Sequence, residues 1–179
     1  MEKKSKKTIN PLDIALVLGY IITVNKGLYS NQGFRMNKSK WNKQFKEVES
    51  WLTHKGYKIS QYTDAEDSIQ WGNKTVYINS RNHPETRYYT LLHECGHLLI
   101  SQTARQWSKD VPMYASVEDA RVERSKAYRV SLVAEEIEAW KRGRRLAKKL
   151  NHYIDNDKYD KQITENVFSY IEAAAEGVV

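Results

Sequence analysis

Residues 87–99 read RYYTLLHECGHLL, which places two histidines four positions apart inside a run of apolar residues. Side chains four apart on an α-helix lie on one face, one turn apart. Apolar residues stand on both flanks of the pair, and a helix that is apolar nearly all round is a buried one. The pattern predicts a buried helix from Pro84 to about Ala104, capped by Asn82 or His83.

The spacing of His93 and His97 lets both imidazoles reach one metal ion, and zinc favours such nitrogen ligands. Glu94 follows the first histidine directly, where a glutamate can take a proton from a water activated by the metal. Two histidines and a glutamate in a buried helix are costly unless they are paired or coordinated. We therefore predict a zinc site with His93 and His97 as ligands and Glu94 as the catalytic base. The alternative is a pair of hydrogen-bonded core histidines.

A catalytic zinc of this kind needs a third protein ligand, and residues 134–140, AEEIEAW, offer three glutamates. Each residue turns a helix by about 100°. Glu136 then borders the apolar stripe, whereas Glu135 points nearly opposite to it and Glu138 points to solvent. Gly143 lies on the same side and would let another helix approach closely. Glu136 is therefore the predicted third ligand; the alternatives are Glu135 as the ligand, or all three glutamates as surface charges. The stripe itself is formed by Val130, Val133, Ile137 and Trp140.

The rest of the pattern predicts an α+β fold, with a small antiparallel sheet packed on the metal helix and further helices before and after it. Period-two alternation marks the three short strands. Residues 105–115 look irregular, residues 116–119 could begin a helix, and residues 151–160 form a polar loop. The predicted strands cover 57–62, 68–71 and 75–79, and the other predicted helices cover 11–26, a segment that contains Trp41, Phe45, Val48 and Leu52, about 125–150, and 161–176.

The positive charge is concentrated at the start of the chain. The formal net charge is +7, residues 1–46 carry a net +8, and the remainder sums to −1. We predict a flexible basic tail over 1–8 and one domain over 9–179, with a helical part over 9–56 and the metal-site core over 57–179. Nucleic acid could bind the basic third, but aromatic residues are not interleaved with the basic ones, which favours a solvated face.

The cellular compartment is indicated by the cysteine content. The chain has a single cysteine, Cys95, and therefore no internal disulfide. We interpret Cys95 as a small buried thiol and expect a cytoplasmic protein. The basic start followed by the apolar run 14–24 resembles a signal peptide, but Asn10 and Pro11 form a helix start. The run is also too short to span a bilayer, so we expect no membrane partner.

With these residues placed, the chain resembles the gluzincin-type zinc metallopeptidases, and among them the ImmA/IrrE-like family found near phage and mobile-element repressors. The resemblance covers residues 75–79 and 87–99, and it resumes at 136–140, EIEAW, which is similar to the family's E-x-x-A-N segment. It implies a zincin-like fold, with His93, His97 and Glu136 as ligands and Glu94 as the base. Trp140, the basic segment 141–149 and residues 1–56 depart from the family pattern.

The resemblance also implies the function we expect, a zinc metallopeptidase that cleaves a protein substrate such as a regulator, in the host cytoplasm if the chain is phage-encoded. An extended peptide would add to an edge strand at 68–71 or 75–79. A tyrosine or histidine would stabilise the oxyanion. The candidates for this role are Tyr88, Tyr89, His83 and His152. The alternatives are a zinc-containing regulatory or nucleic-acid-binding module without catalysis, and a zinc hydrolase of a non-peptide substrate.

Overall fold

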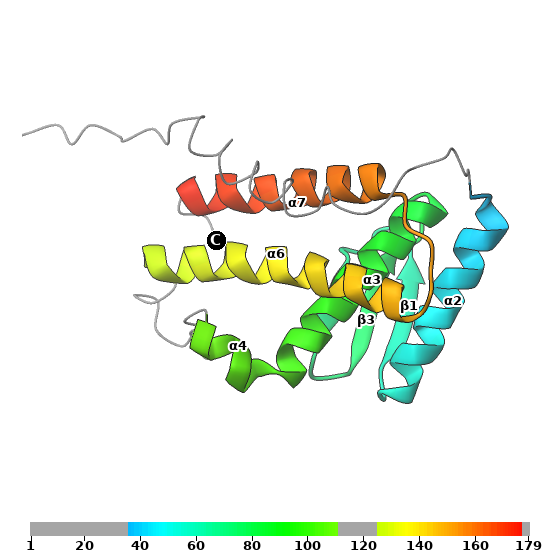
Figure 1. Cartoon of the computed structure of the whole chain (residues 1–179), viewed down its shortest axis with the longest axis horizontal. Coiled ribbons are helices and arrows are strands. Elements are labelled where there is room, and N and C mark those ends of the chain that lie inside the picture. The colour runs from blue at the N-terminus through cyan, green and yellow to red at the C-terminus, as the bar shows by residue number, and fades with distance from the viewer. Residues whose placement is uncertain (1–35, 111–124, 177–179) are drawn as a thin grey trace, which may run out of the picture. The chain divides into compact units, whose positions relative to one another are not determined.

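The structure is a computed structural model that describes residues 36–110 and 125–176, all within the compact unit Arg35–Val179. Helices dominate this unit and a small three-stranded sheet completes it, so the α+β prediction is confirmed in this coarse form (Figure 1). The predicted tail at 1–8, the helix at 11–26 and the helix start at 116–119 lie outside the described residues.

Helix α2, Lys38–His54, is the predicted amphipathic helix, and its four predicted apolar positions are all buried. The Asn37 side chain caps it by accepting a hydrogen bond from the Lys40 N–H. Gly56 follows the helix with φ +80°, a conformation that costs glycine little, and starts the turn into the first strand. The Gln44 amide donates to the Tyr153 carbonyl and accepts from the Tyr153 N–H, which ties α2 to the segment before the last helix.

The sheet contains β1 (Lys58–Tyr62), β2 (Ser68–Gln70) and β3 (Thr75–Asn79) in the order β1-β3-β2. β2 pairs with β3 antiparallel, but β1 pairs with β3 parallel, so the prediction of an antiparallel sheet was wrong for one of its two pairings. Alternation along a strand shows which side chains share a face and carries no information on strand direction. β3 is the central strand and cannot be an edge, which leaves β2 as the edge strand of the two predicted.

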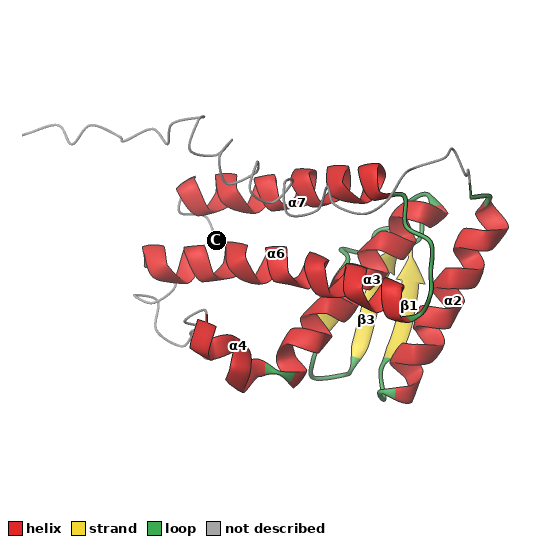
Figure 2. Ribbon diagram, viewed as in Figure 1, coloured by secondary structure: helices red, strands yellow, loops and turns green. Residues whose placement is uncertain are grey.

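Helix α3, Pro84–Gln102, carries the histidine pair and lies between the sheet and α6 (Figure 2). His83 caps it, with its Nδ1 accepting from the Glu85 N–H, and Val76 and Ile78 of β3 are fully buried beneath it. The chain then forms α4, Ala104–Asp110, so the prediction of an irregular segment at 105–115 was wrong over these residues.

Helices α6, Lys126–Lys149, and α7, Asn156–Glu176, are joined by a short link and run side by side in opposite directions (Figure 1). α7 begins five residues before the predicted start at 161, because Asp155 supplies the carbonyl that the Tyr159 N–H needs for the first turn. No helix in the described part of the chain is both long enough and apolar enough to cross a membrane.

The crossing of α3 and α6 depends on two glycines. A Cβ placed on Gly96 would lie 2.0 Å from the Ala139 carbonyl oxygen, and one on Gly143 would lie 2.5 Å from the Leu92 carbonyl oxygen. Both obstacles are backbone atoms, which cannot rotate away. The two helices therefore touch backbone to backbone. Their axes lie closer than the usual 8–10 Å, which applies where bulkier side chains separate two helices. Gly143 has the role that the sequence predicted for it.

We expect Gly143→Ala to destabilise the fold by about 2 kcal/mol, the cost typical of overpacking a core, despite the better helix propensity of alanine. Gly72→Ala is the matched control, because a Cβ there meets nothing within 4 Å. Urea unfolding followed by tryptophan fluorescence measures both variants. Equal unfolding midpoints for the two variants would show that the helices can separate at no cost.

Candidate metal centre

The structure brings together His93 and His97 from α3 and Glu136 from α6 in a cluster that could hold a metal ion. His93 Nε2 lies 3.2 Å from His97 Nε2 and 3.2 Å from Glu136 Oε2. His97 Nε2 lies 3.4 Å from Glu136 Oε1. All three side chains are at most 13% exposed, so the two helices bury the cluster where they cross.

The donor set fits zinc. Ligands at about 2.0–2.1 Å around a tetrahedral zinc lie about 3.3 Å from one another, which is the separation these three side chains already have. Glu136 Oε2 is buried, and no hydrogen bond of good geometry within the described residues satisfies it, although His93 Nε2 is near. Two nitrogens and a carboxylate oxygen turned toward one point are the arrangement that a shared cation would satisfy.

Glu94 lies beside this cluster, with its Oε1 4.0 Å from His93 Nε2 and the residue only 4% exposed. Burial raises the pKa of Glu94 to about 7, with His97 opposing the shift and the charges of Glu136 and Asp67 adding to it. A backbone hydrogen bond from Ile69 of β2 favours the ionised form. A carboxylate whose pKa is near neutral can both accept and return a proton.

Glu135 is also part of the centre, which corrects the prediction that it points nearly opposite to the buried side of α6. Its Oε1 lies 3.2 Å from His97 Nδ1, the nitrogen that faces away from the cluster. A carboxylate in this position fixes the tautomer and ring orientation of a metal-bound histidine. Val130, predicted as part of the buried stripe, is 67% exposed, so the buried face of α6 is rotated from the prediction.

The pKa values of the cluster show how its charges balance. Burial alone would lower the pKa of His97, but the contacts with Glu135 and Glu136 outweigh burial and raise it to about 10. Burial alone would raise the pKa of Glu136, but the contacts with His93 and His97 lower it to about 2. Burial lowers the pKa of His93. In the absence of metal, His97 is therefore the group that carries the balancing proton.

Trp140 closes one side of the centre. Its ring stacks on the His93 imidazole, with centroids 4.4 Å apart at 25°, and its Nε1 donates to Asn166 Oδ1 at 3.1 Å. The tryptophan thus holds the ring of one histidine and links it to α7. The Trp140 ring is buried and also meets the Tyr159 ring of α7 edge to face.

A cleft of about 420 Å³ reaches the centre from outside. Its lining comes from the segment around β2 (Asp67, Ser68, Ile69 and Trp71), from α3, from α6 and from α7. From α7 the cleft receives Gln162, Asn166 and Tyr170, which were not predicted from the sequence. Their signal is a polar line with a spacing of four beside the buried apolar line Tyr159, Ile163 and Val167.

The other residues that the sequence left open are placed elsewhere among the described residues. The Tyr88 hydroxyl contacts His152 Nδ1, and His152 Nε2 contacts Glu47 of α2. The Tyr89 hydroxyl donates to Glu85. Cys95 is a free, fully buried thiol. None of these residues, nor His83, the helix cap, lines the cleft.

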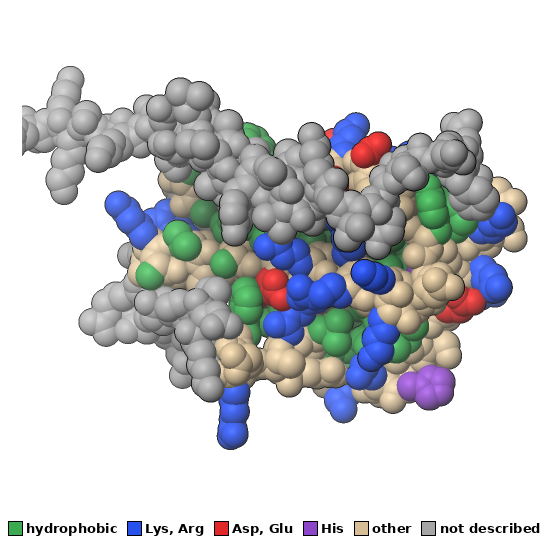
Figure 3. All heavy atoms as spheres, in the orientation of Figure 1, with side chains coloured by type: hydrophobic (Ala, Val, Ile, Leu, Met, Phe, Trp, Pro, Cys, Tyr) green, Lys and Arg blue, Asp and Glu red, His purple; other side chains and the backbone are tan. Residues whose placement is uncertain are grey.

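The remaining glutamate of the segment, Glu138, has a structural role. It pairs with Arg142 at 2.9 Å and with Arg145 at 2.5 Å, and Arg142 also donates to the Leu99 carbonyl near the end of α3. Its side chain is only 16% exposed, so the prediction that it points to solvent was wrong. Basic side chains gather over α6 in Figure 3, as expected near the negative end of a helix dipole.

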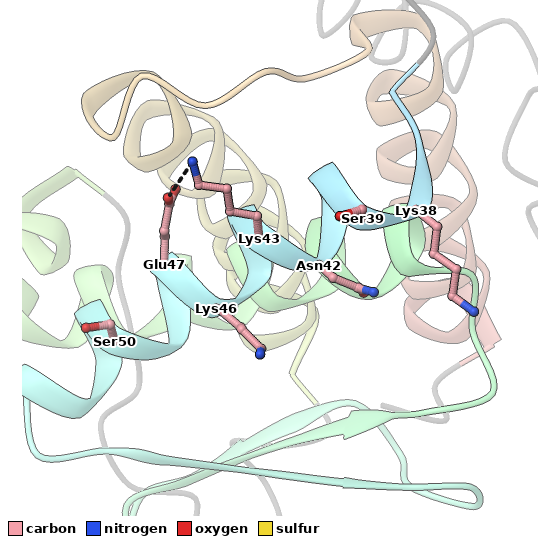
Figure 4. Close-up of a pocket in the computed structure, with 7 residues that line it drawn as sticks. All are labelled: Lys38, Ser39, Asn42, Lys43, Lys46, Glu47 and Ser50. Carbon is pink, nitrogen blue, oxygen red and sulfur yellow. Dashed lines mark ion pairs between the residues drawn. The ribbon is translucent and has the colours of Figure 1, made fainter.

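A larger hollow of about 720 Å³ lies on the outer face of α2, away from the metal centre (Figure 4). The described residues that line it include three lysines and no aromatic side chain. One of the three, Lys43, pairs with Glu47 at 3.9 Å. A groove for single-stranded nucleic acid combines basic side chains with aromatic stacking platforms, and these residues supply only the charge. The lining is Lys38, Ser39, Asn42, Lys43, Lys46, Glu47 and Ser50.

Comparison of the chain with protein-family models, with curated proteins and with solved structures found no match. The function is therefore inferred from the centre itself.

We expect a graded loss of zinc affinity across the three glutamates of α6. Glu136→Gln should cost the most, because it removes a direct ligand. Glu135→Gln should cost about 10–100-fold, the range typical of a residue that orients a metal-bound histidine. Glu138→Gln is the control and should bind zinc like the wild type. Competition with a chromogenic chelator measures all three, and equal affinity of the Glu136 and Glu138 variants would exclude the assigned cluster.

Zinc binding should weaken as the pH falls. Because the pKa of His97 is raised to about 10 in the metal-free protein, its ring is protonated at neutral pH and must lose that proton to bind a metal. Each unit of pH below 10 then costs up to about tenfold in affinity from this group. Calorimetric titration at pH 7 in buffers of different ionisation enthalpy should report about one released proton. An affinity that is the same at pH 6 and pH 8 would contradict the assignment.

Proposed function

We propose that this protein is a zinc-dependent hydrolase of the zincin-like type, and most specifically a metallopeptidase. His93, His97 and Glu136 are the proposed ligands, and Glu94 is the proposed base. The observation that carries the proposal is the cluster of the two Nε2 atoms, 3.2 Å apart, each within 3.2–3.4 Å of a carboxylate oxygen of Glu136, beside a buried glutamate and under an open cleft. A structural zinc site is closed by four protein ligands, whereas a catalytic one keeps a position for water.

A bound zinc ion would supply Lewis acidity, which polarises a carbonyl and makes a water acidic enough to lose a proton near neutral pH. The residues of the chain do the rest. The Glu94 carboxylate accepts the proton of the attacking water, and its raised pKa lets it hold that proton and pass it to the leaving amine. Glu135 holds the His97 ring, and Trp140 holds the His93 ring.

Tyr170 is the proposed donor to the developing oxyanion. It lines the cleft from α7 and interacts with Glu136 through its hydroxyl. Burial and the charges of Glu136 and Glu94 raise the pKa of Tyr170, so the phenol keeps its proton and remains a donor. Tyr88 and Tyr89, the tyrosines considered from sequence, are engaged in the core.

A peptide is the substrate class that the walls of the cleft favour. β2 is an edge strand of the sheet, and its residues Ser68 and Ile69 line the cleft. An extended peptide can add to such an edge through main-chain hydrogen bonds, and because the Ile69 N–H is engaged by the Glu94 carboxylate, a peptide here would use the remaining main-chain groups. A zinc hydrolase of small non-peptide substrates would not need this edge. A regulatory module with a structural zinc would not need the opening to the ligands.

Glu94→Gln should retain the zinc and the fold and lose hydrolysis, because the amide cannot accept the proton of the water. The test expresses wild type and variant in cells and compares the cellular proteins by mass spectrometry of new chain ends, with zinc content measured on both purified proteins. New ends made only by the wild type support the proposal. Identical sets of chain ends from two proteins with equal zinc content would exclude peptidase activity.

A further inference from the structure

The polar line of α7 is the feature of the cleft that the proposed chemistry leaves unused. Gln162, Asn166 and Tyr170 are spaced by four residues and all line the cleft. They are held there because the adjacent apolar line of α7 is packed into the core, with Tyr159 and Val167 fully buried. Tyr170 has a proposed role, but the hydrogen bonds of the two amide side chains go to Trp140 and Thr90 and not to the ligands or Glu94.

Hydrogen bonds fix which atom of each amide is left for a ligand. The Trp140 indole can only donate, so the Asn166 atom that it contacts at 3.1 Å is the oxygen, and the Nδ2 donor is left over. Gln162 donates through Nε2 to Thr90 Oγ1 at 3.3 Å, which leaves its Oε1 as an acceptor. The wall therefore offers an acceptor and, one helical turn further on, a donor.

The two amide side chains can reach two main-chain groups on one edge of an extended peptide. Four residues of α-helix advance about 6 Å along the axis. On one edge of an extended chain N–H and carbonyl groups alternate, and like groups repeat every two residues, about 6.6 Å. Neighbouring unlike groups are therefore closer than one helical turn, and the flexible Gln162 side chain covers the difference. Ser68 and Ile69 of β2 line the same cleft, so a peptide bound to α7 would also lie near this strand.

We infer that α7 binds the main chain of the substrate, with Gln162 Oε1 accepting from a peptide N–H and Asn166 Nδ2 donating to a peptide carbonyl. This inference rests on the proposed function, and it narrows the substrate to a polypeptide segment that is extended and has the edge toward α7 unpaired. Because the recognised groups belong to the main chain, these contacts tolerate different side chains.

The test is binding of hydroxamates to the full-length zinc-loaded protein, followed by calorimetry. Acetohydroxamate reports only on access to the metal. Two further probes each carry three alanines. In the first probe the alanines are on the amino side of the hydroxamate, and in the second they are on its carboxyl side. We expect one of the two to bind at least tenfold more tightly than acetohydroxamate.

Asn166→Asp is the decisive variant, because aspartate keeps the oxygen that accepts from Trp140 and loses only the donor. It should weaken the better peptide probe by about tenfold, the value of roughly one hydrogen bond, and leave acetohydroxamate binding unchanged. Gln162→Leu should lose a similar factor, whereas Gln162→Glu, which keeps the acceptor, should lose less. Ser169→Asp puts the same charge on the exposed side of α7 and should bind both probes like the wild type.

The outcomes separate the inference from the function beneath it. If acetohydroxamate fails to bind the zinc-loaded protein, the open metal site is refuted and the inference falls with it. If acetohydroxamate binds but the peptide probes bind no more tightly, the metal site stands and the role of α7 is overturned. The role of α7 is likewise overturned if Asn166→Asp and Ser169→Asp bind the better probe equally well.

Discussion

The close crossing of α3 and α6 is the constraint on which the rest of the structure depends. At this crossing the backbone of each helix meets a glycine of the other, Gly96 against Ala139 and Gly143 against Leu92. Any larger residue at either glycine would push the helices apart. Because the histidines are on one helix and Glu136 is on the other, the distances within the metal centre depend directly on this separation.

The crossing also creates the electrostatic problem that the centre has to solve. His93, Glu94 and Glu136 are buried in a region where an uncompensated charge is expensive. The cluster compensates by pairing, as the lowered pKa of Glu136 and the raised pKa of His97 show. A proton on His97 or a divalent cation between the three side chains can supply the balancing positive charge, and the two compete for one nitrogen.

The surroundings of the centre come from parts of the chain that are far apart in sequence. The edge strand β2 and α7, about a hundred residues later, both line the cleft. Trp140 connects α7 to the metal centre, since it stacks on His93 and donates to Asn166. The proposed peptidase reaction needs all of these parts: a base, an oriented pair of imidazoles and room for an extended chain.

The sequence by itself determined what is local to one helix. The spacing of four sets the histidines on one face of α3, and the position of Glu136 and Gly143 in their helix was enough to predict that both face inward. The direction of β1 could not be predicted from the sequence, because the period of two is the same in parallel and antiparallel pairs. The rotation of α6 about its own axis could not be predicted from the sequence either. The closest contact is made by small residues, Ala139 and Gly143, which carry little weight in an apolar stripe, so Glu135 faces His97 and Val130 faces solvent. Only the packing of α7 decided that Gln162, Asn166 and Tyr170 face the centre. The apolar side of a helix makes the tertiary contacts, and these contacts determine where its polar side points.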